Sequence, residues 1–187
     1  AENPDNKAAA QLGIMRCALQ TGDEKEALAA ANNILKNQKV SPEVASEARY
    51  VRAKAYINSS NEAAALEDLK ALASDTRTAH GAEAKYLLAQ LYFDQGKDKE
   101  AEKVLDDFAK NGTPHQYWLA RGFILYADIY IRQGDNVQAR VYLNSLKNNY
   151  QADDNIASMI EDRLAKINAK PAEGQKASSA AGSSDNL

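Results

Sequence analysis

A turn residue returns along the chain at a nearly constant spacing. Gly22, Ser60, Gly96 and Gly134 stand 38, 36 and 38 residues apart, and each follows a stretch with the apolar spacing of a helix. A fixed period of this size is typical of stacked helical hairpins. The spacing therefore predicts an all-α array of antiparallel helix hairpins rather than one globular core.

The repeated units share small and aromatic residues around the turn. Residues 86–101 read YLLAQLYFDQGKDKEA, and residues 50–65 and 124–139 align with them without a gap. Small residues allow two helices of a hairpin to approach closely, and an aromatic ring fills the space beside them. A weaker copy contains Met15, Ala18, Gly22 and Ala27. The aligned sets are Ala53, Ala89 and Ala127; Tyr56, Tyr92 and Tyr130; and Ala65, Ala101 and Ala139.

The same pattern divides the chain into units. After an N-terminal extension, residues 1–5, four hairpins are predicted at about 6–38, 42–74, 79–111 and 115–149. Two helices are expected to start where a hydroxyl residue precedes a proline, at Ser41-Pro42 and Thr113-Pro114, because the hydroxyl can cap the helix.

The end of the chain has two further parts. A stripe of Ile156, Ile160, Leu164 and Ile167, with charges opposite, predicts a capping helix within residues 151–170. From residue 171 to 187 the chain has no apolar residue larger than alanine except Pro171 and its last leucine. Such a composition buries too little surface to order itself, so this tail is predicted to be disordered.

Composition excludes several classes of function. The net charge of −3 and the pI of about 5.5 argue against the basic surface of a nucleic-acid binder. No apolar run approaches the roughly 20 residues that cross a bilayer, so membrane insertion is not expected. The N-terminus lacks a signal-peptide pattern and an initiator Met, so the sequence is interpreted as a mature or excised piece of a longer chain.

Residues that often carry chemistry are few and scattered. The single cysteine, Cys17, lies in an apolar stretch and is expected to be a buried structural thiol. His80 and His115 are expected in surface loops before helices, and their spacing predicts no metal site. Adjacent acidic pairs such as Asp106-Asp107 do not converge on a helix. No catalytic group, cofactor or metal is therefore predicted.

The pattern small-x-x-Tyr, Gly, then Ala five residues on resembles the tetratricopeptide repeat. The resemblance covers residues 6–150, is good in the third and fourth copies, and departs at Ser60 and Arg52, where glycine and an apolar residue are usual. It implies a right-handed superhelical array whose first helices line a concave groove. It also implies a non-catalytic scaffold or adaptor that binds a peptide or partner protein there.

Two stretches, residues 82–96 and 148–167, are similar to bacterial repeat proteins of the cell envelope. This second resemblance favours a place in the periplasm or at the outer membrane over the cytoplasm. Two alternatives for function stay open, a homo-oligomerisation module and a regulatory domain cut from a larger protein. The oligomeric state is not predicted.

Register on the first helix of each hairpin predicts the residues that face the groove. Aromatic and aliphatic residues alternate there with both charges, as expected of a surface that holds an extended peptide or a helix. The alternative is that the apolar members only pack neighbouring hairpins together. The predicted protein-binding residues are Tyr50, Lys54, Tyr86, Gln90, Phe93, Arg121 and Asp128.

The wider groove set adds flanking positions on the same helices. Glu47, Glu83 and Asp128 do not match the lysine, asparagine and arginine pattern of repeat proteins that clamp a C-terminal carboxylate, so such a ligand is disfavoured. Trp118 is expected either to seal the junction between the third and fourth hairpins or to be an exposed binding residue. The other members of the set are Leu12, Arg16, Leu19, Ile57, Ile124 and Ile131.

Overall fold

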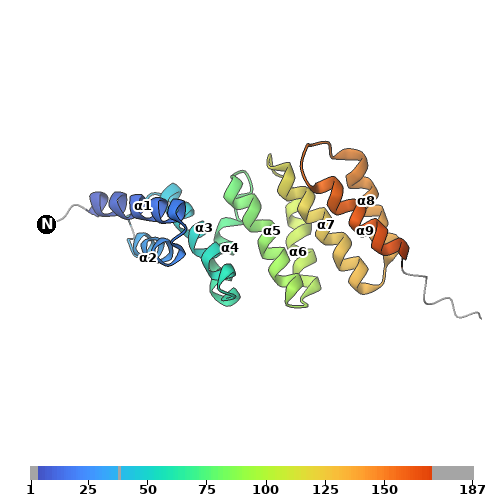
Figure 1. Ribbon diagram of the computed structural model, residues 1–187, viewed down its shortest axis with the longest axis horizontal. Helices are drawn as coiled ribbons and strands as arrows, with labels where there is room; N and C mark the ends of the chain where they lie inside the picture. The colour runs from blue at the N-terminus through green and yellow to red at the C-terminus, as the bar shows by residue number, and fades with distance from the viewer. Residues whose placement is uncertain (1–3, 38, 170–187) are drawn as a thin grey trace, which may run out of the picture.

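The computed structural model describes residues 4–37 and 39–169, and no strand occurs among them (Figure 1). The helices form an elongated stack, with the first hairpin at one end and α9 at the other. The helices are α1 (Pro4–Thr21), α2 (Glu24–Leu35), α3 (Pro42–Asn58), α4 (Glu62–Leu72), α5 (Ala79–Asp94), α6 (Asp98–Asn111), α7 (Gln116–Gln133), α8 (Asn136–Asn149) and α9 (Ile156–Ala169).

The stack has two layers of helices. The inner helices α1, α3, α5, α7 and α9 each contact the next inner helix. The outer helices α2, α4, α6 and α8 each pack against the inner helix before them and the inner helix after them. The chain is therefore the all-α helical-repeat solenoid that the period of the turns predicts.

The repeated turn explains why glycine returns at this position. Gly22, Gly96 and Gly134 have positive φ angles of 76°, 72° and 82°, in the region that residues with a Cβ avoid. Ser60 takes the same conformation, with a φ of 57°, although it is not glycine. The turn geometry is thus kept in all four hairpins, and at Ser60 it is strained.

One of the two predicted helix starts is correct. Pro42 is the first residue of α3, and the Ser41 hydroxyl accepts a hydrogen bond of 3.4 Å from the Val44 amide. The start predicted at Thr113-Pro114 is wrong, because α7 begins at Gln116. The Thr113 hydroxyl instead donates to the carbonyl of Thr76 at 2.6 Å, so it joins two loops.

Alanines hold the helices of a hairpin close together. Ala89 and Ala101 are both fully buried where α5 meets α6, and Ala127 and Ala139 are fully buried where α7 meets α8. No side chain larger than a methyl group separates the backbones at these points, which allows close packing. The repeated alanines of the sequence are therefore spacing residues of the fold.

The helix α9 occupies the position of a fifth inner helix. Ile156, Ile160 and Ile167 are buried against α7 and α8, and Leu164 is half-buried. Asp154 caps its start, because the Ile156 amide donates to the Asp154 carboxylate at 2.9 Å. The tail predicted to be disordered, residues 171–187, lies outside the described residues. No helix among those described has the length and apolar content to cross a membrane.

Two of the three chemically reactive side chains singled out in the sequence, Cys17 and His80, lie elsewhere than expected. Cys17 is exposed, because Met15 and Ala18 take the packed face of α1 and leave Cys17 on another face. His80 is half-buried within α5, and His115 is half-buried with Nε2 3.1 Å from the carbonyl oxygen of Arg77. The predictions of a buried thiol and of a loop position for His80 are therefore wrong, whereas His115 lies in the loop directly before α7, as predicted.

Candidate protein-binding surface

Polar side chains on the first three inner helices join each helix to the next. Arg16 on α1 donates two hydrogen bonds, each of 2.7 Å, to the Glu47 carboxylate on α3. This pairing lowers the pKa of Glu47 below its usual value. On α5, the Glu83 carboxylate accepts hydrogen bonds from Lys54 at 2.9 Å and from the Tyr50 hydroxyl at 2.8 Å. Each contact comes from equivalent positions of successive hairpins.

The contact between α5 and α7 uses a tyrosine hydroxyl in place of a carboxylate. Arg121 donates to the Tyr86 hydroxyl at 2.6 Å, and that hydroxyl donates to the Gln90 side chain at 2.9 Å. The Arg121 guanidinium also lies over the Tyr86 ring, 4.6 Å from its centroid. Burial is the main cause that raises the pKa of Tyr86, so its hydroxyl stays protonated at neutral pH.

The last inner contact reverses the order of the charges. Asp128 on α7 accepts two hydrogen bonds, of 2.7 and 2.6 Å, from Arg163 on α9. In the first two contacts the cation precedes the carboxylate along the chain, whereas here the carboxylate comes first. The ion pairs at the two ends of the inner surface therefore have their cation and carboxylate in opposite order along the chain.

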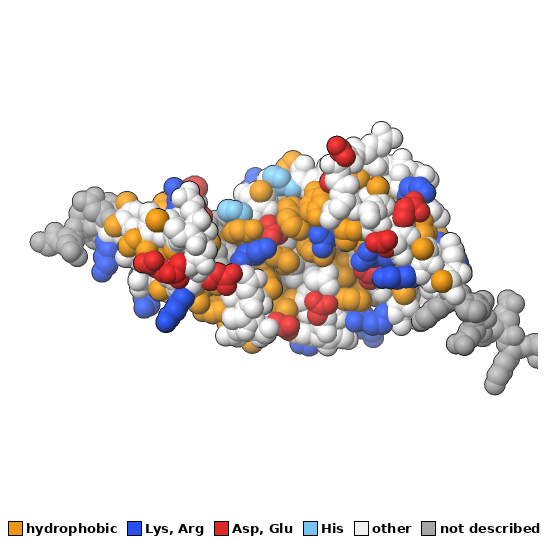
Figure 2. Space-filling view, in the orientation of Figure 1, with side chains coloured by type: hydrophobic (Ala, Val, Ile, Leu, Met, Phe, Trp, Pro, Cys, Tyr) orange, Lys and Arg blue, Asp and Glu red, His pale blue; other side chains and the backbone are white. Residues whose placement is uncertain are grey.

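A pocket of about 350 Å³ opens on the inner surface between the first two hairpins and the start of α5. Its apolar lining includes Leu19, whose side chain is 48% exposed, together with Val51 and Ala55. Figure 2 shows this face of the molecule, with hydrophobic side chains also gathered over α5 and α7. The other lining residues are Glu24, Ala27, Glu47, Tyr50, Lys54, Asn58 and His80.

One wall of the pocket is made of stacked rings. The rings of Tyr50 and His80 lie nearly parallel, with centroids 4.1 Å apart. Burial is the main cause that raises the pKa of Tyr50, and the hydrogen bond to Glu83 adds to it. His80, expected in a loop, thus shapes the pocket together with a predicted binding residue.

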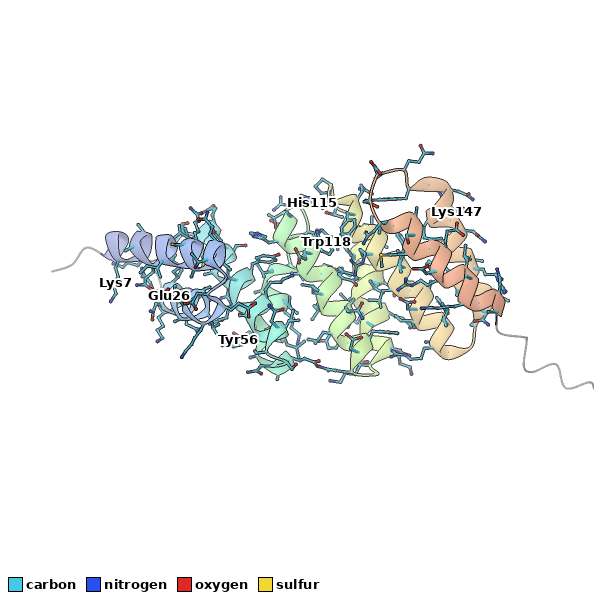
Figure 3. The ribbon with its side chains drawn as sticks, viewed as in Figure 1. Lys7, Glu26, Tyr56, His115, Trp118 and Lys147 are labelled. Atoms are coloured by element: carbon cyan, nitrogen blue, oxygen red, sulfur yellow. The ribbon has the colours of Figure 1, made fainter. Side chains whose placement is uncertain are left out.

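The stacked pair recurs between the third and fourth hairpins, with Trp118 at the position of His80 and Tyr86 at that of Tyr50. Trp118 stacks on Tyr86 with ring centroids 5.7 Å apart and meets Tyr117 edge-on at 5.0 Å. Figure 3 marks Trp118 near the start of α7, on the side of α5. Trp118 is half-buried and packs against the cluster that joins these hairpins. It therefore seals the junction.

The predicted binding residues fall into two groups. Tyr50 and Lys54 line the pocket and are half-buried. Tyr86 is only 6% exposed, so its ring has little surface left for a partner. The other predicted residues are half-buried and are held by neighbouring side chains. Gln90, Arg121 and Asp128 make the contacts described above. The Phe93 ring lies under the Arg132 guanidinium, whose Cζ is 3.6 Å from the ring centroid.

Sequence reasoning missed two features of this surface. Arg163 lies in the segment that was predicted only as a capping helix. It follows its partner Asp128 by 35 residues, just as Arg121 follows its partner Tyr86 by 35 residues. This shared spacing is the sequence signal of a fifth inner helix. The pocket itself has no sequence signal, because it depends on the small side chains of Ala27 and Ala55 in two different helices.

The described residues contain no group of three or more His, Cys, Asp or Glu side chains that could hold a metal ion. The acidic residues singled out in the sequence have neighbours of other kinds. Asp106 accepts a hydrogen bond from Tyr126, and Asp107 pairs with Lys85. These carboxylates fix the helices α5, α6 and α7 relative to one another.

Comparison with known proteins identifies the repeat. The tetratricopeptide repeat matches residues 83–111, which span most of α5 and all of α6, and residues 123–152, which span most of α7 and all of α8. No curated protein and no solved structure matches the chain. Residues of the third and fourth hairpins are thus similar to the tetratricopeptide repeat, and repeats of this family generally mediate protein–protein interactions.

Proposed function

We propose that this chain is a non-catalytic scaffold or adaptor that binds a peptide or partner protein on its inner surface. The observation that carries the proposal is the open pocket beside Leu19, at the end of a surface that runs along successive inner helices. Tetratricopeptide repeats are typically non-catalytic, which supports the absence of an enzymatic role.

The binding mode that we propose is an apolar side chain of the partner inserted into the pocket. Leu19 and Val51 supply apolar contact, while Lys54 and Glu47 at the rim are already paired within the chain. A partner therefore need not neutralise these charges on binding. The predicted residues Tyr50 and Lys54 take part directly, whereas Tyr86, Gln90, Phe93, Arg121 and Asp128 contribute as the rest of the surface.

The rigid stack favours binding because its side chains are already placed. The inner contacts described above hold Tyr50, Lys54 and Arg121 in fixed positions, so the partner bears most of the ordering entropy. The place of action that we propose is the bacterial cell envelope, on the sequence resemblance of residues 82–96 and 148–167. Fractionation of the native cells tests this location.

Site-specific photo-crosslinking in the native cells tests the proposed surface. A photo-reactive amino acid at Leu19, in the pocket, is compared with the same amino acid at Val137, which is 69% exposed on α8. We expect a discrete crosslinked partner from position 19 that position 137 does not give. Lys54→Glu, which replaces the cation paired with Glu83 by a second carboxylate, should reduce the yield at position 19.

The results that contradict the proposal are equally defined. Equal crosslinking from both positions, or none from position 19, would remove the pocket as the binding site. A crosslink from position 19 to another copy of the same chain would favour the alternative of a homo-oligomerisation module.

A further inference from the structure

Two register positions meet where one inner helix contacts the next. The first is the residue 6 positions before the turn of one hairpin, and the second is the residue 13 positions before the turn of the next hairpin. At the first two junctions these positions hold a cation and a carboxylate. The pairs are Arg16 with Glu47 and Lys54 with Glu83.

The last junction, between α7 and α9, also has an ion pair at this place. Asp128 stands 6 residues before its turn, and Arg163 donates to it. The carboxylate and the cation have exchanged positions, so both orders of charge fit this register. In each of these junctions the half-buried cation or acid on the inner surface is neutralised within the chain.

The junction between α5 and α7 differs from the others. Its two register positions hold Gln90 and Arg121, so an amide stands where the other junctions have a charged group. Arg121 forms no ion pair with a carboxylate of the described residues. Its guanidinium donates to the hydroxyls of Tyr86 and Tyr117, which do not neutralise its charge.

The guanidinium of Arg121 keeps hydrogen-bonding capacity for another molecule. A guanidinium has five N–H donors, and Nη1 and Nη2 each make one bond, of 3.1 and 2.6 Å. The Nε donor is buried and has no acceptor within the described part of the chain. The Tyr117 hydroxyl accepts the bond from Nη1, and no described residue accepts its own proton. Unsatisfied donors of this kind are unfavourable until an acceptor arrives.

Aromatic rings hold this cation in place. The Cζ of Arg121 lies 4.6 Å from the centroid of the Tyr86 ring and 5.8 Å from that of the Tyr117 ring. Trp118 packs against both rings, with centroids 5.7 and 5.0 Å away. Rings around a half-buried cation shield it from water, which strengthens its attraction to an anion.

We propose that Arg121 binds an aspartate or glutamate side chain of the partner. The partner's carboxylate supplies the charge that Glu47, Glu83 and Asp128 supply at the other junctions, and the Tyr117 hydroxyl donates to it. This inference rests on the function proposed above, because it adds an acidic side chain, one junction further along the inner surface, to the apolar side chain in the pocket. The partner segment therefore carries an apolar and an acidic residue at a fixed spacing.

An exchange of two neighbouring side chains tests the site without changing the net charge. Gln90 donates to the exposed Asp94 at 2.8 Å, so Gln90→Glu together with Asp94→Asn keeps a hydrogen bond between these positions. The introduced carboxylate stands in the register of Asp128 and pairs with Arg121 within the chain, so it competes with the partner's carboxylate. Asp94→Asn alone is the matched control, because it leaves position 90 uncharged.

The probe is a set of short glycine–serine peptides, acetylated and amidated, with one leucine and one variable residue. The variable residue is glutamate, glutamine or phosphoserine at different spacings from the leucine. Further peptides lack the leucine, or carry glutamine and a free C-terminal carboxylate. At one spacing we expect the parent chain to bind the glutamate peptide about tenfold more tightly than the glutamine peptide, measured by fluorescence anisotropy. The double variant should lose this preference, and Asp94→Asn should keep it.

Three binding results would overturn the proposal. They are no preference for glutamate in the parent chain, an equal loss of preference in Asp94→Asn, and tighter binding of phosphoserine or of the free C-terminal carboxylate. If leucine raises binding but glutamate does not, this inference alone fails. If leucine has no effect, the function proposed above fails, and this inference with it.

Urea unfolding of the double variant separates binding from folding. Its free energy of unfolding should equal or exceed that of the parent chain, because Arg121 gains an ion pair. Lost preference in a chain of unchanged or higher stability supports the proposal, since a purely structural Arg121 would not couple the two. A clear decrease in stability would contradict it, because position 90 would then not face Arg121.

Discussion

Two hairpins of this chain fill the same repeat positions with opposite chemistry. Eight residues before and eight residues after the turn, the second hairpin has Arg52 and Asp68, joined by hydrogen bonds of 2.6 and 2.9 Å. The fourth hairpin has Tyr126 and Tyr142, whose rings stack with centroids 4.9 Å apart. One fold thus accepts a buried ion pair or an aromatic pair at the same place.

The difference explains which half of the chain matches the family. Arg52 departs from the apolar residue usual at its position, and the structure supplies the reason, because Asp68 is fully buried and requires a cation. Arg49 adds a second hydrogen bond to Asp68 at 3.0 Å. Only the third and fourth hairpins, with apolar and aromatic residues at these positions, match the tetratricopeptide repeat.

The same contrast decides where a pocket can form. In the first two hairpins the buried cluster consists mostly of alanines with Met15, Ile34 and Val51, and the pocket lies beside it. In the last two hairpins, the buried cluster instead contains the large rings of Tyr86, Phe108 and Tyr126, with Trp118 packed against it. Small side chains keep the fold but leave a surface hollow, whereas large ones close it.

The largest effect is expected from the aromatic half. Phe108, 12 residues after its turn, is fully buried under α7, and Ile34 is its equivalent in the first hairpin. Phe108→Ala should lower the free energy of unfolding by about 4 kcal/mol and Ile34→Ala by about 3 kcal/mol, because the larger ring leaves the larger cavity. Urea unfolding measures both changes. A loss of unfolding free energy in Ile34→Ala that equals or exceeds the loss in Phe108→Ala would contradict the contrast between the two halves.

In the second hairpin, replacing both residues of the ion pair by apolar residues should be tolerated, whereas replacing only one of them should not. Asp68→Val alone should cost about 3 kcal/mol, because it leaves the half-buried Arg52 without its partner. The double change Arg52→Leu and Asp68→Val, which copies Leu88 and Val104 of the third hairpin, should return to within about 1 kcal/mol of the parent chain. A double variant as unstable as the single one would show that the two chemistries are not interchangeable.

Alkali should weaken the C-terminal half more than the N-terminal half. Burial is the main cause that raises the pKa of Tyr126, and its hydrogen bond to Asp106 adds to it; burial also raises the pKa of Tyr86 and of Tyr130. A raised pKa in the folded state means that stability is full below the unfolded value near 10 and is lost above it, because the unfolded chain then releases protons that the folded chain keeps.

Each such tyrosine contributes at most about 1.4 kcal/mol per pH unit above pH 10. Urea unfolding between pH 9 and pH 11 measures the loss. Tyr126→Phe should reduce the slope with pH, because it removes one of the tyrosines whose pKa is raised in the folded state. Identical slopes in the parent chain and Tyr126→Phe would contradict this account.

The smallest effect is expected at the turns. Ser60→Gly should stabilise the chain by about 1 kcal/mol, because glycine adopts the positive φ of 57° without the strain of a Cβ. Gly96→Ser, the reverse change at the equivalent turn of the third hairpin, should destabilise it by a similar amount. Thermal unfolding tests both, and a loss of stability in Ser60→Gly would mean that the serine makes a compensating contact.

The sequence by itself determined the all-α solenoid, its repeat period and the roles of the alanines and turn glycines. These features follow from local rules, since apolar residues at steps of three and four define one face of a helix, and a turn with positive φ selects glycine. The stripe of Ile156, Ile160 and Ile167 identified α9 in the same way.

Only the tertiary structure decided which inner-surface residues are available. The register that put Tyr50 and Tyr86 on one surface is the same in both hairpins, yet Tyr50 lines a pocket while Tyr86 is buried under Trp118 and Arg121. Exposure depends on the size of side chains that neighbouring hairpins bring to the same place, which no single helix specifies. For the same reason Cys17, on an apolar stretch, is exposed: the face of α1 on which it lies has no covering helix among the described residues.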